Sequence, residues 1–380
     1  MRRKGNVLFS KDKSCFGVLV VVVALLFAVL QPSILDAKTF TVNNRMDLVD
    51  ANPGDGICRA VILIETEEGE IELPLGCTLR AAIMEANAFP GADIIRLRPG
   101  IFRLNLSGVS KEMAGAMGDL DIKGKLNIFG DSEEETIIDA TALSDRIFDI
   151  HDGSVVLAQD MTLMGGTVLG GPEDHRDLVV GVTPEDLAGN PALSVSSIAA
   201  LSCPIIEPTD KGDGGAILNR GGVAIIRNVK FEGNLAICDG GAIDSINDAV
   251  MVLTCCDFEF NTAISDGGAV ENDEDSIMII NNGKFEWNNA YENGGAIANE
   301  DSLMWLLESK MQYNAAEVYG GAIWNGDSDV MFITNTGIRF NDALEDGGGV
   351  FNEDGFLRMN GCAIENNSPN DIVDANIPEG

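Results

Sequence analysis

A pair of adjacent glycines returns at a fixed interval along the second half of this 380-residue chain. The stretch DGGAVEN (266–272) has close copies that begin at residues 213, 239, 293, 319 and 346, so each step is 26 or 27 residues. A second marker follows each glycine pair by about 17 residues and keeps the same interval: FEGN, FEFN, FEWN, MQYN, IRFN and IENN begin at residues 231, 258, 285, 311, 338 and 364. Two markers with one period indicate a repeat protein whose units stack on their neighbours.

The segments between the markers are short and apolar, for example AVMVLTCCDF (249–258) and SIMIINNGKF (276–285). They are rich in Val, Ile, Met and Phe and are bounded by Gly, Asn and Asp, which is typical of buried strands. Leucine-rich repeats have a similar length, but their leucine spacing and helical segment are missing. One coil per repeat, with each strand paired to its equivalent in the next, predicts an all-β, right-handed parallel β-helix of about ten coils that rise by roughly 4.8 Å each.

The recurring residues have physical roles in such a coil. The glycine pair permits a turn with positive φ and close packing, and the Phe, Met or Ile of the second marker stacks inside. We expect the asparagine of that marker to take a left-handed turn position. Amides in register can also hydrogen-bond along a column, but we expect turn geometry to be the main reason for these residues: Asn234, Asn261, Asn288, Asn314, Asn341 and Asn367 in one column, and Asn219, Asn272, Asn299, Asn325 and Asn352, interrupted by Ser245, in another.

Residues 38–166 resemble the start of the same solenoid, because strand-like segments such as IIRLRPGIFRLNL (94–106) are separated by glycines. One helix is predicted among them, from Thr78 to Ala88. Thr78 suits its N-cap, and the helix should stop at Pro90-Gly91. We expect it to cover the open end of the β-helix with one apolar face, formed by Leu79, Ala82, Ile83 and Ala86.

Residues 167–212 break the period before the regular repeats of 213–380 begin. The segment contains five prolines and reads as a long excursion from the side of the solenoid. Long insertions often carry function. Plain decoration of the fold is the alternative.

The N-terminus has the pattern of a signal peptide, residues 1–37, with cleavage after Ala37. An apolar run from Cys15 to Leu30 follows five basic residues: Arg2, Arg3, Lys4, Lys11 and Lys13. A single membrane anchor is the alternative, because the run is close to the lower length limit for spanning. We therefore expect an exported protein, extracellular, on the cell surface or periplasmic, with no transmembrane domain after cleavage.

The formal net charge is −35, and loss of the basic leader makes the rest more acidic still. Nucleic acids and anionic membranes are therefore poor partners. Surface glycans or proteins are the expected partners. A strongly negative surface stays soluble by repulsion or collects divalent cations.

Seven cysteines remain after cleavage, and an exported protein can form disulfides. Cys58 and Cys77 flank a short insertion and are the best single candidate pair. An odd total leaves at least one free thiol or an intermolecular bridge.

The segment CTLRAAIMEANAFPGADIIRL (77–97) resembles the signature of the CSLREA domain, which is found near the N-terminus of exported bacterial proteins. The glycine and FxxN markers are similar to the β-helix repeats that accompany this domain and to the repeats of chlamydial polymorphic outer membrane proteins, which are surface adhesins. Ala81 stands where the CSLREA pattern has glutamate. The resemblance implies an exported β-helix protein that acts as a non-catalytic, adhesin-like binding element.

A carbohydrate-active enzyme, either a polysaccharide lyase or a hydrolase, is the alternative function for this fold. The local trio Asp149, His151 and Asp152 offers groups for acid and base work, and Asp149 and His151 share a face if they lie on a strand. Neither a nucleophile nor a cationic clamp accompanies the trio in the sequence. An ordinary surface group is therefore the competing interpretation.

An acidic turn follows each glycine motif, and stacking of the coils would align these turns along one edge. Carboxylates roughly 5 Å apart repel one another, and Ca²⁺ relieves such repulsion through oxygen ligands. A hydrated face screened by salt is the alternative. The candidate ligands are Asp248, Asp273, Asp275, Asp301, Asp327, Asp329 and Asp354.

Overall fold

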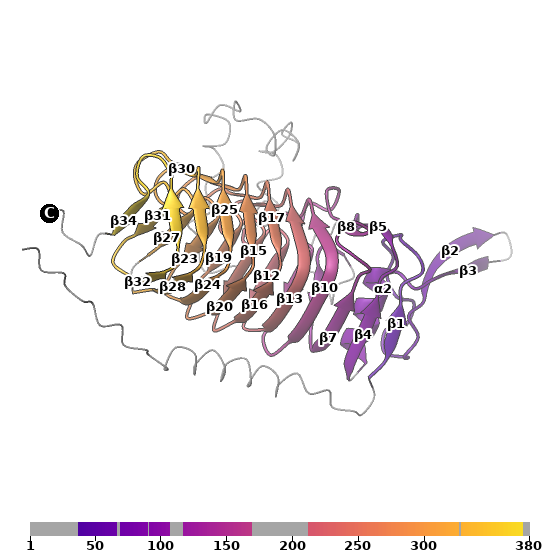
Figure 1. Ribbon diagram of the computed structural model, residues 1–380. Helices are drawn as coiled ribbons and strands as arrows, with labels where there is room; N and C mark the ends of the chain where they lie inside the picture. The colour runs from indigo at the N-terminus through magenta and orange to yellow at the C-terminus, as the bar shows by residue number, and fades with distance from the viewer. Residues whose placement is uncertain are drawn as a thin grey trace, which may run out of the picture.

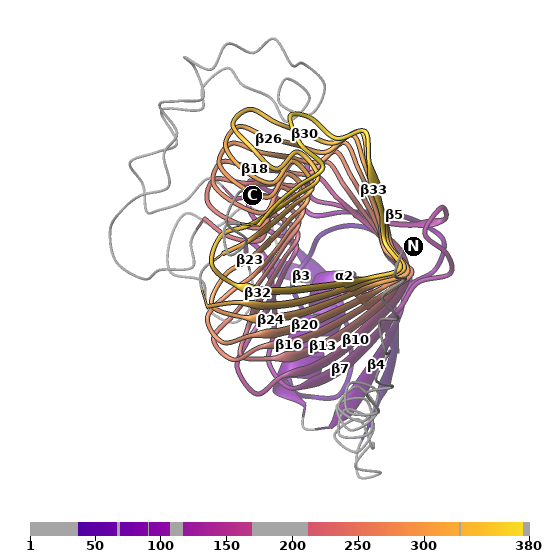
Figure 2. The same ribbon diagram turned by 60° about the vertical axis from the view of Figure 1, so that its left-hand side comes forward.

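The computed structural model describes residues 37–66, 69–89, 91–106, 117–168, 212–326 and 328–374. Over these residues the chain forms a parallel β-helix in which each repeat makes one coil and lies against the next (Figures 1 and 2). The all-β, parallel β-helix class predicted from the repeat, with one helix, is confirmed. Residues 1–36 of the predicted signal peptide and residues 169–211 of the predicted insertion lie outside the described residues.

The solenoid has about seven regular turns, not the predicted ten. The difference arises in the N-terminal part, where β1 (Thr39–Thr41) and β4 (Ala92–Arg96) pair as parallel neighbours. The residues between them form a hairpin and a helix, so they add no coil. The regular coil also reaches two residues beyond its predicted end, because β11 (Thr167–Val168) pairs with the following coil.

Strands of the first face of the solenoid lie in register from coil to coil, as in the pairing of Val250 with Ile277. Together with a second face they form one 17-stranded sheet. Besides β1 and β4, the first face contains β7 (Lys125–Phe129), β10 (Val155–Met164), β13 (Val223–Glu232), β16 (Val250–Thr254), β20 (Ile277–Asn281), β24 (Leu303–Leu307), β28 (Val330–Thr334) and β32 (Phe356–Asn360).

We call the second face the groove face. The long strands β10 and β13 run through both faces, whereas later coils bend between two separate strands. The other strands of the groove face are β5 (Gly100–Arg103), β8 (Thr136–Asp139), β17 (Asp257–Glu259), β21 (Lys284–Glu286), β25 (Lys310–Gln312), β29 (Gly337–Arg339) and β33 (Ala363–Glu365).

A third face follows each glycine turn. Its sheet contains β6 (Leu120–Ile122), β9 (Phe148–Ile150), β12 (Ile217–Arg220), β15 (Ile243–Ile246), β19 (Val270–Asn272), β23 (Ile297–Asn299), β27 (Ile323–Asn325), β31 (Val350–Asn352) and β34 (Ile372–Asp374). Short strands connect the groove face to the glycine turns: besides β11, these are β14 (Leu235–Ala236), β18 (Thr262–Ala263), β22 (Asn289–Ala290), β26 (Ala315–Ala316) and β30 (Asp342–Ala343).

Side chains of equivalent positions stack along the interior, as the second marker predicts. The rings of Phe231 and Phe258 lie 4.7 Å apart and those of Phe258 and Phe285 lie 4.6 Å apart, nearly parallel in both pairs. Met311 and Ile338 continue the column in the next coils. These buried side chains belong to one continuous apolar core.

The glycine pair has the two roles expected of it. Gly267, the first glycine of its pair, has φ +63°. A Cβ on Gly268 would lie 2.2 Å from the carbonyl oxygen of Gly295 in the next coil. A larger residue would force the coils apart, so the pair sets both the turn and the coil spacing.

The asparagine of the second marker does not take the left-handed position, so this prediction is wrong. The preceding residue does, for example Trp287 before Asn288, with φ +60°. The amides instead bond along the column: Asn261 Nδ2 donates to Asn288 Oδ1 at 2.9 Å, and Asn288 Nδ2 donates to Asn314 Oδ1 at 2.9 Å. A buried amide needs hydrogen-bond partners, and the equivalent asparagines of the neighbouring coils provide them. This hydrogen bonding, more than turn preference, explains asparagine at these positions.

The predicted capping helix is confirmed as α2 (Leu79–Ala88). Thr78 is its N-cap, and its hydroxyl oxygen accepts a hydrogen bond from the backbone N–H of Ala81 at 3.1 Å. Leu79, Ala82 and Ile83 are buried in the core. The helix lies at the N-terminal end of the solenoid, beside β4 and β6 (Figure 1).

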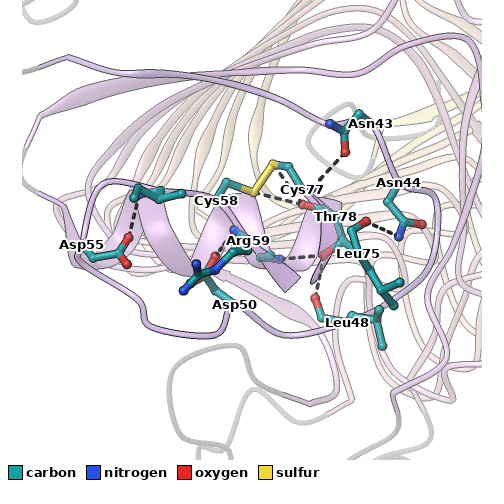
Figure 3. Close-up of a disulfide and its surroundings, with 12 residues drawn as sticks. Asn43, Asn44, Leu48, Asp50, Asp55, Cys58, Arg59, Leu75, Cys77 and Thr78 are labelled. Atoms are coloured by element: carbon teal, nitrogen blue, oxygen red, sulfur yellow. Dashed lines mark hydrogen bonds between the residues drawn. A yellow bond between two sulfur atoms is a disulfide. The ribbon is translucent and has the colours of Figure 1, made fainter. Parts of the chain in front are cut away.

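The predicted disulfide between Cys58 and Cys77 is also confirmed. Figure 3 shows it beside the start of α2, where the Thr78 hydroxyl donates to the carbonyl of Leu48 at 2.6 Å. The bridge closes the base of the hairpin formed by β2 (Ala60–Thr66) and β3 (Gly69–Gly76), which projects from the solenoid (Figure 1). It therefore holds the hairpin against the cap.

Among the residues that the structure describes, no helix is long and apolar enough to cross a membrane.

Candidate functional site

The structure brings together two of the three predicted acid and base residues. Asp149 lies in the middle of β9, and His151 Nε2 lies 3.9 Å from its Oδ2. The same nitrogen contacts Asp121 Oδ1 more closely. Asp121 comes from β6, one coil earlier, where it is the register partner of Asp149. Asp152 lies in the exposed turn after β9 and takes no part in these contacts.

Two arginines surround Asp149, which corrects the expectation that no cationic group accompanies the trio. Arg220, from the next coil, donates through Nε to Asp149 Oδ1 at 3.2 Å. Arg146 Nη1 lies 3.8 Å from Asp149 Oδ2. Arg146 lies only three residues before Asp149, whereas Arg220 reaches it through the pairing of β9 with β12 and is not visible in the local motif.

This charged network is internally neutralised. Burial alone would raise the pKa of Asp121, but the hydrogen bond from His151 and the charge of Lys123 hold it below its ordinary value. Burial and the nearby Arg146 lower the pKa of Arg220. Asp121 and Asp149 thus each have cationic partners, and the network ties three coils together.

The predicted calcium ladder does not assemble as a single set. Four of its members are exposed in the turns, Asp273 is half-buried, Asp329 is buried, and Asp327 lies outside the described residues; the exposed four are Asp248, Asp275, Asp301 and Asp354. Burial raises the pKa of Asp273 and of Asp329 to about 7. Within the described residues, the groups of carboxylates close enough to share a metal ion contain none of these positions.

A groove that the sequence analysis missed runs along the groove face. Its floor is formed by outward side chains of β17, β21 and β25, since Phe258 and its equivalents point inward. The groove has a volume of about 440 Å³ and adjoins a second depression of about 330 Å³. Both are lined by Glu133 and Asp257, and the first also by Asn228, Cys255, Asn282, Gly283, Lys284, Glu308 and Lys310.

Lysines and glutamates alternate along this groove in a continuous row. Lys230 Nζ lies 3.0 Å from Glu259, and Lys284 Nζ bridges Glu259 at 2.9 Å and Glu286 at 3.1 Å. Lys310 extends the row with a 3.1 Å contact to Glu286. The parallel register places these side chains one coil apart, so the row repeats at the coil spacing.

Two kinds of carboxyl group face each other in the groove. Burial raises the pKa of Asp257, against the opposing charge of Lys284, and burial also raises the pKa of Glu133. For Glu259 the effect of burial is overcome by hydrogen bonds from Lys284 and Lys230, so its pKa is lowered. Neighbouring carboxyls with opposite shifts suit separate roles as proton donor and proton acceptor.

An exposed row of aromatic side chains follows the strands of the groove face. Phe260, Trp287, Tyr313 and Phe340 follow β17, β21, β25 and β29, all with φ between +58° and +60°. The rings of Trp287 and Tyr313 lie 4.6 Å apart, and those of Tyr313 and Phe340 lie 5.6 Å apart. Trp287 is 52% exposed. We call this row the aromatic ridge. The aromatic residue at the third position of the markers FEFN, FEWN, MQYN and IRFN is the sequence feature that could have indicated this ridge.

No protein-family model and no curated protein sequence matches this chain. Three solved structures are similar to it in fold. They are jun a 1, the major allergen from cedar pollen (13% identity, TM-score 0.43, covering 93% of this chain and 82% of that chain), pectin methylesterase PemA from Erwinia chrysanthemi (12%, 0.37, 76% and 86%) and the A-module of mannuronan C-5 epimerase AlgE4 from Azotobacter vinelandii (12%, 0.27, 74% and 90%). At this identity the likeness concerns the fold alone.

Proposed function

We propose that this protein is carbohydrate-active: a polysaccharide lies along the groove face and is hydrolysed there by Asp257 and Glu259. The observation that carries the proposal is the groove itself, with its repeating row of lysines and glutamates and its carboxyl groups of opposite pKa shift. The aromatic ridge follows the same strands.

The chemistry of the groove suits sugar hydroxyls, which both donate and accept hydrogen bonds. Lys284 and Lys310 supply donors, Glu259 supplies acceptors, and the amide of Asn282 supplies both. A polymer of equal units can repeat these contacts along the row. The apolar edge of the aromatic ridge supplies a surface for the C–H groups of the sugar rings.

Charge favours a neutral polysaccharide over an acidic one. The lysines of the groove are outnumbered by Glu133, Asp257, Glu259 and Glu286, and the whole chain has a net charge of −35. A polyuronate chain would be repelled from this face.

The geometry of β17 supports hydrolysis by inversion. Asp257 and Glu259 lie two residues apart on one face of the strand, about 6.6 Å along its axis, which is in the range of carboxyl pairs that leave room for a water molecule. Asp257 is the general acid in this scheme and donates a proton to the glycosidic oxygen as the bond to the anomeric carbon breaks. Glu259 takes a proton from the water that attacks this carbon, so one new reducing end forms for each bond cleaved.

The test is to incubate the protein with a panel of neutral and acidic polysaccharides and to measure binding, new reducing ends and unsaturated products. We expect reducing ends from a neutral polymer, and a loss of about a hundredfold in rate for Asp257→Asn. His151→Ala is the matched control, because His151 belongs to the separate charged network, and it should keep the activity.

Each other result has a definite meaning. Activity lost in His151→Ala and kept in Asp257→Asn would move the chemistry to the charged network and overturn the proposal. Binding without any product would favour the non-catalytic, adhesin-like role that the sequence analysis put first. Neither binding nor product on the whole panel would contradict a carbohydrate role altogether.

We also propose that the protein works outside the cytoplasm and that its N-terminal part is a CSLREA domain. The basic and apolar pattern of residues 1–37 and the disulfide of the cap support export. The motif of residues 77–97 supports the domain assignment. Secretion with release of the leader, followed by N-terminal sequencing of the product, tests the export.

A further inference from the structure

A second carboxylate cluster lies away from the groove, where the glycine turns meet the third face. Asp239 and Asp266 each precede a glycine pair, and Glu271 lies in β19 five residues after Asp266. One carboxylate oxygen from each of these three residues lies within 4.8 Å of the other two. Asp244, the register partner of Glu271 in β15, lies one coil before it on the same face.

Glu271 and Asp244 are withdrawn from solvent without the cationic partners that buried charges need, whereas Asp239 and Asp266 are half-buried. Glu271 and Asp244 are each 2% exposed. Glu271 Oε2 and Asp244 Oδ1 are buried oxygen atoms with no hydrogen-bond partner. Over the part of the chain that the structure describes, none of the four carboxylates forms a salt bridge with a lysine, arginine or histidine. A buried anion of this kind needs a compensating cation.

The cluster is local and does not belong to a general acidic face. In the column before the glycine pairs, Asp213, Asp239 and Asp266 are followed by Asn293, Tyr319 and Asp346. In the outward column of the third face, Asp244 and Glu271 stand between Leu218 and Ala298, as the strand register shows. Among the described residues, only these two coils have an acid both before the glycine pair and at the outward position of the third face. A site assembled from the two columns needs both acids.

We propose that Asp239, Asp266 and Glu271, with Asp244 beside them, bind one Ca²⁺ ion that joins two successive coils. Ca²⁺ takes six to eight oxygen ligands at about 2.3–2.6 Å. Two ligands on opposite sides of one ion are therefore about 5 Å apart. The three oxygens lie within 4.8 Å of one another, so one ion can contact all of them. The smaller Mg²⁺ binds oxygens at about 2.0–2.1 Å and needs a tighter set.

The backbone already holds two of the ligands in place. Asp239 Oδ1 accepts the N–H of Asp266 at 3.0 Å, and Asp266 Oδ1 accepts the N–H of Asn293 at 2.6 Å. These bonds run from each coil to the next, so the aspartates are fixed before an ion arrives. A bound ion would remove the repulsion between the carboxylates of these two successive coils.

The test measures Ca²⁺ binding by calorimetry on chelator-treated full-length protein, together with the melting temperature in chelator, Ca²⁺ and Mg²⁺. We expect one site per chain and a higher melting temperature in Ca²⁺ than in chelator. Glu271→Gln should weaken Ca²⁺ binding at least about tenfold, since affinity follows the number of charged ligands. In chelator the same variant should melt above the wild type, because one uncompensated charge has gone.

Asp301→Asn is the matched control, because Asp301 is an exposed member of the acidic turns, and it should leave both measurements unchanged. Absence of Ca²⁺ binding by the wild type would overturn the proposal. So would equal binding by Glu271→Gln, equal effects of Mg²⁺ and Ca²⁺, or loss of binding in the control. If Glu271→Gln fails to fold, Asp266→Asn carries the same comparison.

Discussion

Arg80 and Asp47 form a salt bridge that is fully closed to solvent on both sides. Arg80 Nε donates to Asp47 Oδ1 at 2.6 Å, and Nη2 donates to Oδ2 at 3.1 Å. Both side chains have no exposed surface. The arginine also donates to the carbonyls of Gly118 and Asp119, so it connects the capping helix to the first coils.

Arg80→Met is expected to destabilise the protein by about 3–5 kcal/mol, because Asp47 would be left buried with its charge uncompensated. Chemical denaturation followed by circular dichroism measures this loss. Arg103→Met is the control: Arg103 is 65% exposed and pairs with Asp139 at 3.4 Å, so it should cost less than about 1 kcal/mol. Equal losses in the two variants would contradict a structural role for the buried pair.

Replacing a single asparagine of the buried column should strongly lower the free energy of unfolding. Asn288 Oδ1 accepts from the backbone N–H and from Nδ2 of Asn261, and its Nδ2 donates to Phe258 and Asn314. Asn288→Ala removes four hydrogen bonds and leaves buried partners unsatisfied, so we expect a loss of about 3 kcal/mol or more in unfolding free energy. Asn366→Gly, at an exposed position with φ +63°, should stay within about 0.5 kcal/mol of the wild type.

The period and residue types were enough to predict the coil, the stacked phenylalanines, the capping helix and the disulfide. These features depend on local spacing or on repetition, which a single sequence contains. The charged network around Asp149 was only half visible, because Asp121 and Arg220 reach it through pairing between coils. The groove was missed for the same reason: Lys230, Glu259 and Lys284 become neighbours only after three coils are stacked.

The aromatic ridge predicts that an exposed tryptophan can be removed with little loss of stability. Trp287 has φ +60°, a conformation that costs a non-glycine residue about 1–2 kcal/mol, and its stacking on Tyr313 returns about 0.5–1.5 kcal/mol. Trp287→Gly should therefore change the unfolding free energy by less than about 1 kcal/mol. If the ridge contacts a glycan, polysaccharide affinity should fall roughly tenfold, or about 1.4 kcal/mol.

Phe285→Ala is the contrasting variant for the ridge, because Phe285 is stacked at a similar spacing inside the core. It should cost about 3–5 kcal/mol in stability. A Trp287→Gly variant that is as unstable as Phe285→Ala would show that the ridge is part of the packing and not a free surface.

The buried carboxyl group of Asp329 should lower the free energy of unfolding as pH rises. Burial raises its pKa to about 7, and Oδ2 is buried with no hydrogen-bond partner. Because the folded-state pKa lies above the unfolded value, folding is weakened progressively from about pH 4 and fully above about pH 7, by up to about 4 kcal/mol. Asp329→Asn keeps the Oδ1 bond from Ser302 and removes the charge. It should be more stable than the wild type at pH 8 and equally stable near pH 4, whereas Asp248→Asn, at an exposed turn residue, should follow the wild type throughout.

Because Cys255 and Cys256 differ in exposure, a thiol reagent can be used to test whether the polysaccharide binds in the groove. Cys255 is an exposed thiol that lines the groove, whereas Cys256 is fully buried and burial raises its pKa to about 12. The thiolate is the reactive form, so a maleimide should label Cys255 and leave Cys256 untouched, as peptide mass spectrometry can show. A bulky label on Cys255 should also abolish polysaccharide binding, and Cys255→Ser should bind normally before and after treatment, even where the partly exposed Cys362 is labelled. Full binding by the labelled protein would place the polysaccharide away from this groove.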